Sequence, residues 1–156
     1  MEGPILLAMS TARKSPKSMQ RAADLAKERD TSLVAVFALE EDVIENVVGK
    51  LSSEGWIGER PSQEFYDSAV GQRRDVGERK LALAREYADA AGVRFESHLM
   101  PGSFERVVKD AVAEFRPQAV VLTRRKRSGI SRFFLGSPAA KLATELDCET
   151  VLVDEE

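Results

Sequence analysis

The chain has 156 residues, of which 43% are hydrophobic and 31% charged, and its formal net charge is -3 at pH 7. This length suits a core that forms without disulfides or metals, so residues 1–156 are expected to be a single domain. The acidic balance gives no general attraction for nucleic acid, and no apolar run approaches the ~20 residues that cross a membrane. The only cysteine, Cys148, cannot form an internal disulfide, and no signal-peptide pattern precedes the first apolar run. These features together indicate a cytoplasmic protein.

The first part of the chain alternates apolar runs with helical spacing. Ile5 to Met9 is a short apolar run after Gly3-Pro4 and is predicted to be a buried strand. Ser15-Pro16 then opens a helix whose apolar positions, from Met19 to Ala26, fall at helical spacing. A second buried strand is predicted from Leu33 to Ala38.

The segment from Glu40 to Gly71 is the least regular part of the chain. Apolar residues at helical spacing from Val43 to Leu51 predict a short amphipathic helix, which belongs either to the core or to a subunit contact. The glycines and prolines that follow, from Ser52 to Ser62, favour a loop.

A long helix is predicted next, from Ser62 or Gln63 to Ala91. Gly92 is suited to end it in the left-handed conformation. Gly71 and Gly77 fall inside this helix and each weakens it locally by ~1 kcal/mol.

The second half repeats the alternation of strands and helices. Val93 to Met100 alternates apolar with polar residues, which predicts a strand with one wet face at a sheet edge. The elements that follow are a helix started by Gly102-Ser103 and running to Phe115, a buried strand Ala119 to Leu122, a helix from Ser137 to about Leu146, and a strand Thr150 to Val153. This pattern predicts an α/β protein, with a Rossmann-like five-stranded parallel sheet covered by helices on both faces.

The connection between the last two strands carries the strongest functional signal. Thr123 to Leu135 is polar and basic, with Arg124-Arg125-Lys126-Arg127 in one run, and Gly136-Ser137-Pro138 then opens a helix. A strand end, a basic loop and a helix N-terminus together suit a phosphate group. The simpler alternatives are that Ser137 only caps the helix, worth ~1 kcal/mol, and that the basic run is a solvated loop.

This stretch resembles the universal stress protein family. Nucleotide-binding members of that family have Gly-x2-Gly-x9-Gly-Ser/Thr after the fourth strand, and the matching positions here are Thr123, Lys126, Gly136 and Ser137. Two of the glycines are therefore replaced, although the spacing survives. The resemblance covers most of the chain and implies the strand order 3-2-1-4-5.

The resemblance also implies an adenine-nucleotide site where the first and fourth strands end, at the switch point of the sheet. The family's Asp at the end of the first strand is Ser10 here, whereas Val36 and Gly102 match positions that line the site in relatives. The expected binding residues are Ala8, Met9, Ser10, Val36, Gly102, Leu122, Thr123, Arg124, Lys126, Gly136, Ser137, Pro138 and Ala139. The directions of the side chains that replace glycines decide whether the cleft is filled or open.

Three functions are consistent with these residues. The first is a stress-response regulatory module that senses an adenine nucleotide, ATP or AMP (with Mg²⁺ if ATP), or another phosphate ligand. The resemblance implies a homodimer through the C-terminal strand, Thr150 to Val153. The second is a nucleotide-independent homodimeric interaction protein, its cleft closed by Thr123 and Lys126, which meets an unknown protein partner through its dimer surface and the Val43 to Trp56 segment. The third is a slow ATPase.

No residue is assigned a catalytic or metal-binding role. His98 is the only histidine, and Cys148 precedes a buried strand, where cysteine usually acts as a small hydrophobe. The sequence contains neither Gly-x4-Gly-Lys-Ser/Thr nor Gly-x-Gly-x-x-Gly after the first strand. We therefore expect at most slow ATP hydrolysis, no metal site, and no nucleic-acid or membrane partner.

Overall fold

The structure is a computed structural model that describes residues 3–11, 15–40, 63–124 and 138–155. Its strands are β1 (Ile5–Met9), β2 (Leu33–Leu39), β3 (Phe95–Pro101), β4 (Ala119–Arg124) and β5 (Glu149–Asp154). Its helices are α1 (Pro16–Glu28), α3 (Gln63–Ala91), α4 (Phe104–Phe115) and α6 (Pro138–Glu145). Every strand and helix predicted within these residues is found, with ends shifted by one or two residues. The helix predicted from Val43 to Leu51 and the loop from Ser52 to Ser62 lie outside the described residues.

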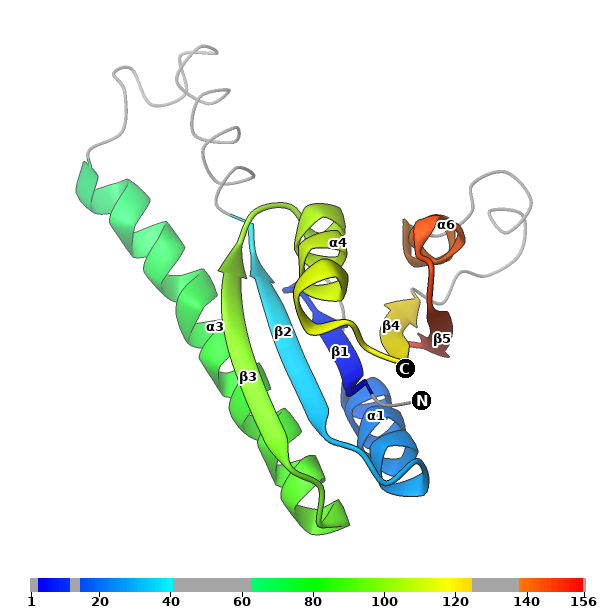
Figure 1. Cartoon of the computed structure of the whole chain (residues 1–156). Helices are drawn as coiled ribbons and strands as arrows, with labels where there is room; N and C mark the ends of the chain where they lie inside the picture. Colours follow the sequence, from blue (N-terminus) through cyan, green and yellow to red (C-terminus); the bar gives the residue numbers. More distant parts are fainter. Residues whose placement is uncertain (1–2, 12–14, 41–62, 125–137, 156) are drawn as a thin grey trace.

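The five strands form one parallel sheet in the order β3-β2-β1-β4-β5 (Figure 1). The central strand β1 pairs with β2 in the register Ile5↔Leu33 and with β4 in the register Ile5↔Ala119. The predicted Rossmann-like α/β fold with strand order 3-2-1-4-5 is therefore confirmed. The prediction that the alternating strand β3 lies at a sheet edge is confirmed as well.

Helices cover both faces of the sheet and bury two separate cores (Figure 1). One core packs α1 and α3 against one face, and the other packs α4 and α6 against the opposite face. Alternate residues of each strand enter different cores, because side chains along a strand point to opposite faces. In β4, for example, Val121 belongs to the α1/α3 core, whereas Val120 and Leu122 belong to the α4/α6 core. The strands β1 and β2 are buried over their whole length.

The long helix α3 lies close against β2 and β3 because one of its residues has no side chain. A Cβ atom at Gly77 would lie 2.6 Å from Leu99 Cδ2 and 2.6 Å from Phe37 Cδ1. Both of those side chains belong to the α1/α3 core. The glycine that the sequence marks as a weak point of the helix is thus the point where the helix approaches the sheet. At Gly71, by contrast, a Cβ atom would meet no atom within 4 Å among the described residues.

The helix ends follow the predicted signals. The helix α1 begins at Pro16, and the Ser15 side chain makes no capping hydrogen bond there, although the Ser15 carbonyl accepts from the Met19 amide at 2.8 Å. At the start of α4 the Ser103 hydroxyl accepts a hydrogen bond of 3.3 Å from the Arg106 amide. The helix α3 ends before Gly92, which has a φ of 71°. Among the described helices, none is both long enough and apolar enough to cross a membrane.

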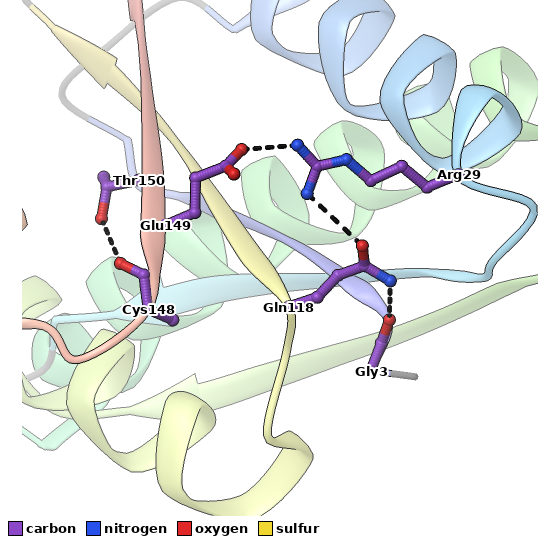
Figure 2. A network of polar contacts seen from close by, with 6 residues as sticks. All are labelled: Gly3, Arg29, Gln118, Cys148, Glu149 and Thr150. Carbon is purple, nitrogen blue, oxygen red and sulfur yellow. Dashed lines mark hydrogen bonds and ion pairs between the residues drawn. The ribbon is translucent and has the colours of Figure 1, made fainter. Parts of the chain in front are cut away.

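The amino ends of the strands are tied together by one polar network (Figure 2). Gln118, which is only 6% exposed, donates to the Gly3 carbonyl at 2.6 Å and accepts from Arg29 at 3.3 Å. Arg29 also forms an ion pair of 2.6 Å with Glu149, and the Thr31 hydroxyl donates to the Gly3 carbonyl at 3.0 Å. This network therefore joins, at the amino end of the sheet, the segment before β1, the end of α1 and the starts of β4 and β5.

The close approach of α3 predicts opposite effects for two alanine substitutions in the same helix. Gly77→Ala should lower the free energy of unfolding by about 1–3 kcal/mol, because overpacking against Phe37 and Leu99 exceeds the gain in helix propensity. Gly71→Ala should raise it by about 0.5–1 kcal/mol, because the helix gains propensity without a new contact. Urea unfolding of both variants measures the two changes. Stabilisation by both substitutions would contradict the packing described here.

Candidate functional site

The two central strands separate at their carboxyl ends. The ladder between β1 and β4 ends at Leu7↔Val121, although β1 continues to Met9 and β4 to Arg124. Over the same stretch β1 stays paired with β2 up to Met9↔Phe37, and β4 stays paired with β5 up to Arg124↔Asp154. The fork therefore opens between the strands at the switch point, which is where open α/β sheets bind ligands.

The apolar residues expected at this site are fully buried in the two cores. Ala8, Val36 and Leu122 are at most 1% exposed and pack in the α4/α6 core. Met9 is 2% exposed and lies in the α1/α3 core on the other face. These four side chains therefore pack the strand ends into the two cores.

Thr123, which stands at the first glycine position of the family motif, points toward α1. Its Oγ1 lies 2.6 Å from the Ser18 Oγ, and Ser18 and Thr123 are 0% and 5% exposed. Ala119 and Val121 share this face of β4 and pack in the α1/α3 core. The side chain that replaces glycine is thus held by a buried hydrogen bond on the α1 side of the fork. The α4/α6 side is free of it.

Ser10, in place of the family's aspartate, is buried to 8% exposure at the end of β1. Its carbonyl oxygen accepts a hydrogen bond of 2.7 Å from the Lys80 ammonium. The end of β1 therefore has a cation at the position where the resemblance led us to look for a carboxylate.

Gly102 closes the end of β3 next to β2. Its φ is 121°, a conformation that residues with a side chain rarely adopt, and its amide donates to the Leu39 carbonyl at 3.1 Å. A Cβ atom there would come no closer than 3.7 Å to Val107, so backbone conformation rather than space requires glycine. The glycine at position 102 is therefore explained by the backbone conformation alone, without a bound ligand.

Arg124, expected to supplement the phosphate site, is paired with a carboxylate of the neighbouring strand. Its Nε lies 2.7 Å from Asp154 Oδ1, and this hydrogen bond raises the pKa of the guanidinium further above its usual range. The Glu155 amide also donates to the Arg124 carbonyl at 2.8 Å. A ligand phosphate would have to compete with Asp154 for this side chain.

The remaining expected residues belong to the loop and to the start of α6. Lys126, Gly136 and Ser137 lie outside the described residues, so the capping and phosphate-binding roles of Ser137 stay predictions. Pro138 and Ala139 are the first residues of α6. Because α6 joins two parallel strands, its N-terminus lies at the carboxyl end of the sheet, where helix amides favour an anion.

Two cations that the sequence pattern did not identify lie on α3 and reach the same end of the sheet. Lys80 reaches the Ser10 carbonyl, and Arg73 Nη1 donates to the Thr11 hydroxyl at 3.2 Å. Glu40, directly after β2, is near Arg73, and burial raises the pKa of its carboxyl while Arg73 offsets part of that rise. The available signal was the seven-residue spacing of Arg73 and Lys80, which places both on one helix face.

The residues considered for catalysis lie apart from this end of the sheet. His98, on β3, is 2.8 Å from Glu96 Oε2, and its ring centroid is 5.0 Å from that of Phe115. Burial raises the pKa of the Cys148 thiol, so the thiolate form is disfavoured. Within the described residues no group of three histidine, cysteine, aspartate or glutamate side chains could hold a metal ion.

The chain is an open parallel α/β sheet of the Rossmann-like class, with a forked switch point and a helix N-terminus at the same end of the sheet. The sequence profile of the universal stress protein family matches residues 1–154, and the chain belongs to that family. No curated protein matches the chain.

Solved structures share the fold at low sequence identity. A universal stress protein in complex with cAMP is 20% identical, with 100% of both chains covered and a TM-score of 0.63. The Archaeoglobus fulgidus universal stress protein in complex with dAMP is 17% identical, with 99% of this chain and 98% of that chain covered and a TM-score of 0.53. A family protein from Arabidopsis thaliana with AMP bound is 14% identical, with 98% and 92% covered and a TM-score of 0.56.

The Ser18–Thr123 hydrogen bond predicts coupling between these two positions. Ser18→Ala or Thr123→Val alone should each cost about 1–3 kcal/mol, because one buried hydroxyl is left without its partner. The double variant should cost about 1 kcal/mol less than the sum of the single variants. A double-mutant cycle by urea unfolding measures this difference, and strict additivity would argue against the bond.

Proposed function

We propose that this chain is a stress-response regulatory module that binds an adenine nucleotide in the fork between β1 and β4. The observation that carries the proposal is the direction of Thr123, whose side chain is held against Ser18 on the α1 side of the fork. The replacement of the first glycine therefore does not fill the site from this strand. The phosphate would bind the N-terminus of α6, with Gly136, Ser137 and Lys126 as its contacts.

The choice of an adenine nucleotide is supported by the structural relatives. Three of them hold cAMP, dAMP and AMP, which are all adenine nucleotides with a single phosphate group. AMP is accordingly the first ligand to test, and ATP with Mg²⁺ is the second. In this proposal the main chain from Ala8 to Ser10 and the end of β2 at Val36 support the base and ribose.

The proposed role is binding and regulation rather than catalysis. The protein would act in the cytoplasm as a single domain and as a homodimer through β5. That strand is an edge of the sheet whose central residues, Val151 to Val153, are all partly exposed. The backbone groups of an edge strand can pair with a strand of another chain, and pairing with β5 of a second copy would cover these apolar residues. Slow ATP hydrolysis is the weaker alternative, and its signature is Mg²⁺-dependent phosphate release that Ser137→Ala abolishes.

A nucleotide-independent interaction protein is the second candidate, and one observation favours it. The Arg124 guanidinium is already paired with Asp154 at 2.7 Å, so the carboxyl end of the sheet neutralises part of its own charge. In this function the cleft stays empty and the protein meets its partner through β5 and the Val43 to Trp56 segment.

The nucleotide proposal predicts a bound ligand and a defined loss. Protein purified without added nucleotide should release AMP or ATP on acid treatment, identified by mass, or bind added AMP in calorimetry. Gly136→Val and Ser137→Ala should each weaken that affinity at least tenfold, because the phosphate contacts are lost or obstructed.

The matched control is Thr144→Ala, which alters a hydroxyl at the far end of the same helix that donates to the Lys141 carbonyl. This variant should bind as the unmodified protein does. An empty protein that also fails to bind AMP and ATP would exclude the proposal and leave the interaction protein.

A further inference from the structure

Two cations of α3 converge on consecutive residues at the end of β1. The Lys80 ammonium donates to the Ser10 carbonyl at 2.7 Å, and the Arg73 guanidinium donates to the Thr11 hydroxyl at 3.2 Å. In both hydrogen bonds the acceptor is a neutral oxygen. The end of β1 therefore has two positive side chains on the α1/α3 side of the fork, opposite the α4/α6 side where α6 begins.

The geometry of α3 explains why both cations reach this place. A 29-residue helix is about 43 Å long, roughly twice the length of the seven-residue strands β2 and β3, and its first turns extend beyond their carboxyl ends (Figure 1). Gly77 lies between the two cations and lets the helix approach the sheet. Arg73 and Lys80, which flank Gly77 on the same helix face, are thereby carried to the strand end.

The surroundings of the cations make an additional anion favourable. Burial lowers the pKa of the Lys80 ammonium, although the nearby Glu155 carboxylate opposes this shift. Arg73 has the Glu40 carboxyl nearby, whose pKa is raised by burial and lowered by Arg73. A partly buried ammonium is stabilised by a phosphate oxygen in direct contact, because charge-assisted hydrogen bonds are the strong ones.

We propose that Arg73, Lys80 and the Thr11 hydroxyl form a second phosphate subsite at the end of β1, across the fork from the α6 N-terminus. The inference rests on the proposed function in that both subsites serve one ligand. A ligand with phosphates on two sides of its ribose reaches both subsites, whereas AMP reaches one. Adenosine 3′,5′-bisphosphate is therefore bound more tightly than AMP.

The first experiment tests the subsite without a nucleotide. Inorganic phosphate is titrated into the full chain while ¹H–¹⁵N spectra follow the backbone amides of Ser10 and Thr11. These amides should shift in a saturable way, and the shift should disappear in Arg73→Gln and Lys80→Met. The controls are Arg74→Gln and Arg79→Gln, each of which removes one exposed cation from a neighbouring position of α3. The control variants and the test variants therefore have the same net charge. A response that the controls lose equally would reflect net charge only and would overturn the subsite.

The second experiment measures the preference between the two nucleotides by calorimetry at fixed ionic strength. The unmodified protein should bind adenosine 3′,5′-bisphosphate about tenfold more tightly than AMP, as one added charge-assisted contact allows. Arg73→Gln and Lys80→Met should weaken binding of the bisphosphate more than binding of AMP and so remove that preference, while the far-ultraviolet circular dichroism spectrum stays as in the unmodified protein. Glu40→Gln should enlarge the preference, because it removes the carboxylate near Arg73.

The two proposals fail in different ways. Binding of AMP with no preference for the bisphosphate, and with unmoved Ser10 and Thr11 amides, overturns the subsite and leaves the nucleotide site. Phosphate-dependent shifts at Thr11 without binding of any adenine nucleotide support the subsite and exclude the proposed function.

Discussion

The polar residues of the central strands β1, β2 and β4 lie only at or beyond the ends of these strands, because helices bury the middle of the sheet on both faces. β1 and β2 are buried along their whole length, and β4 is buried up to its last residue. Parallel strands of this kind cannot present side chains to water from their faces. A ligand can therefore contact the central strands only at their ends, where the hydrogen bonding between strands stops and the chain continues into a loop.

The two ends of the sheet differ in how their polar groups are paired. At the amino end, Gln118 joins the Gly3 carbonyl to Arg29, and Arg29 continues to Glu149, so the polar groups there satisfy one another (Figure 2). At the carboxyl end, β1 and β4 part after Leu7↔Val121, and side chains from α1 and α3 approach the strands separately. The polar side chains at the amino end thus contact one another, whereas those at the carboxyl end contact the strands one by one.

Much of the fold follows from short-range patterns in the sequence. The strand from Ile5 to Met9 and the helix starts at Ser15-Pro16 and Gly102-Ser103 need only local residues, because apolar runs, caps and turn glycines act within a few positions. The strand order came from the family resemblance, since periodicity does not say which strands are neighbours. From the sequence, Gly77 was predicted only to weaken α3. Its packing role could not be predicted, because the glycine is required by contacts with Phe37 and Leu99, which are far from it in the sequence.

The candidate site was also only partly predictable from short-range patterns in the sequence. Alternation along β4 places Thr123 on the face of Ala119 and Val121, but only the position of α1 shows that this face is turned away from α6. Loss of a motif glycine is therefore ambiguous until the direction of its replacement is known. The cations of α3 illustrate the converse, because Lys80 is 70 residues from Ser10 and no local pattern links them. The motif positions of the candidate site could therefore be predicted from the sequence, whereas the contacts of Lys80 and Arg73 with the end of β1 depend on the packing of α3.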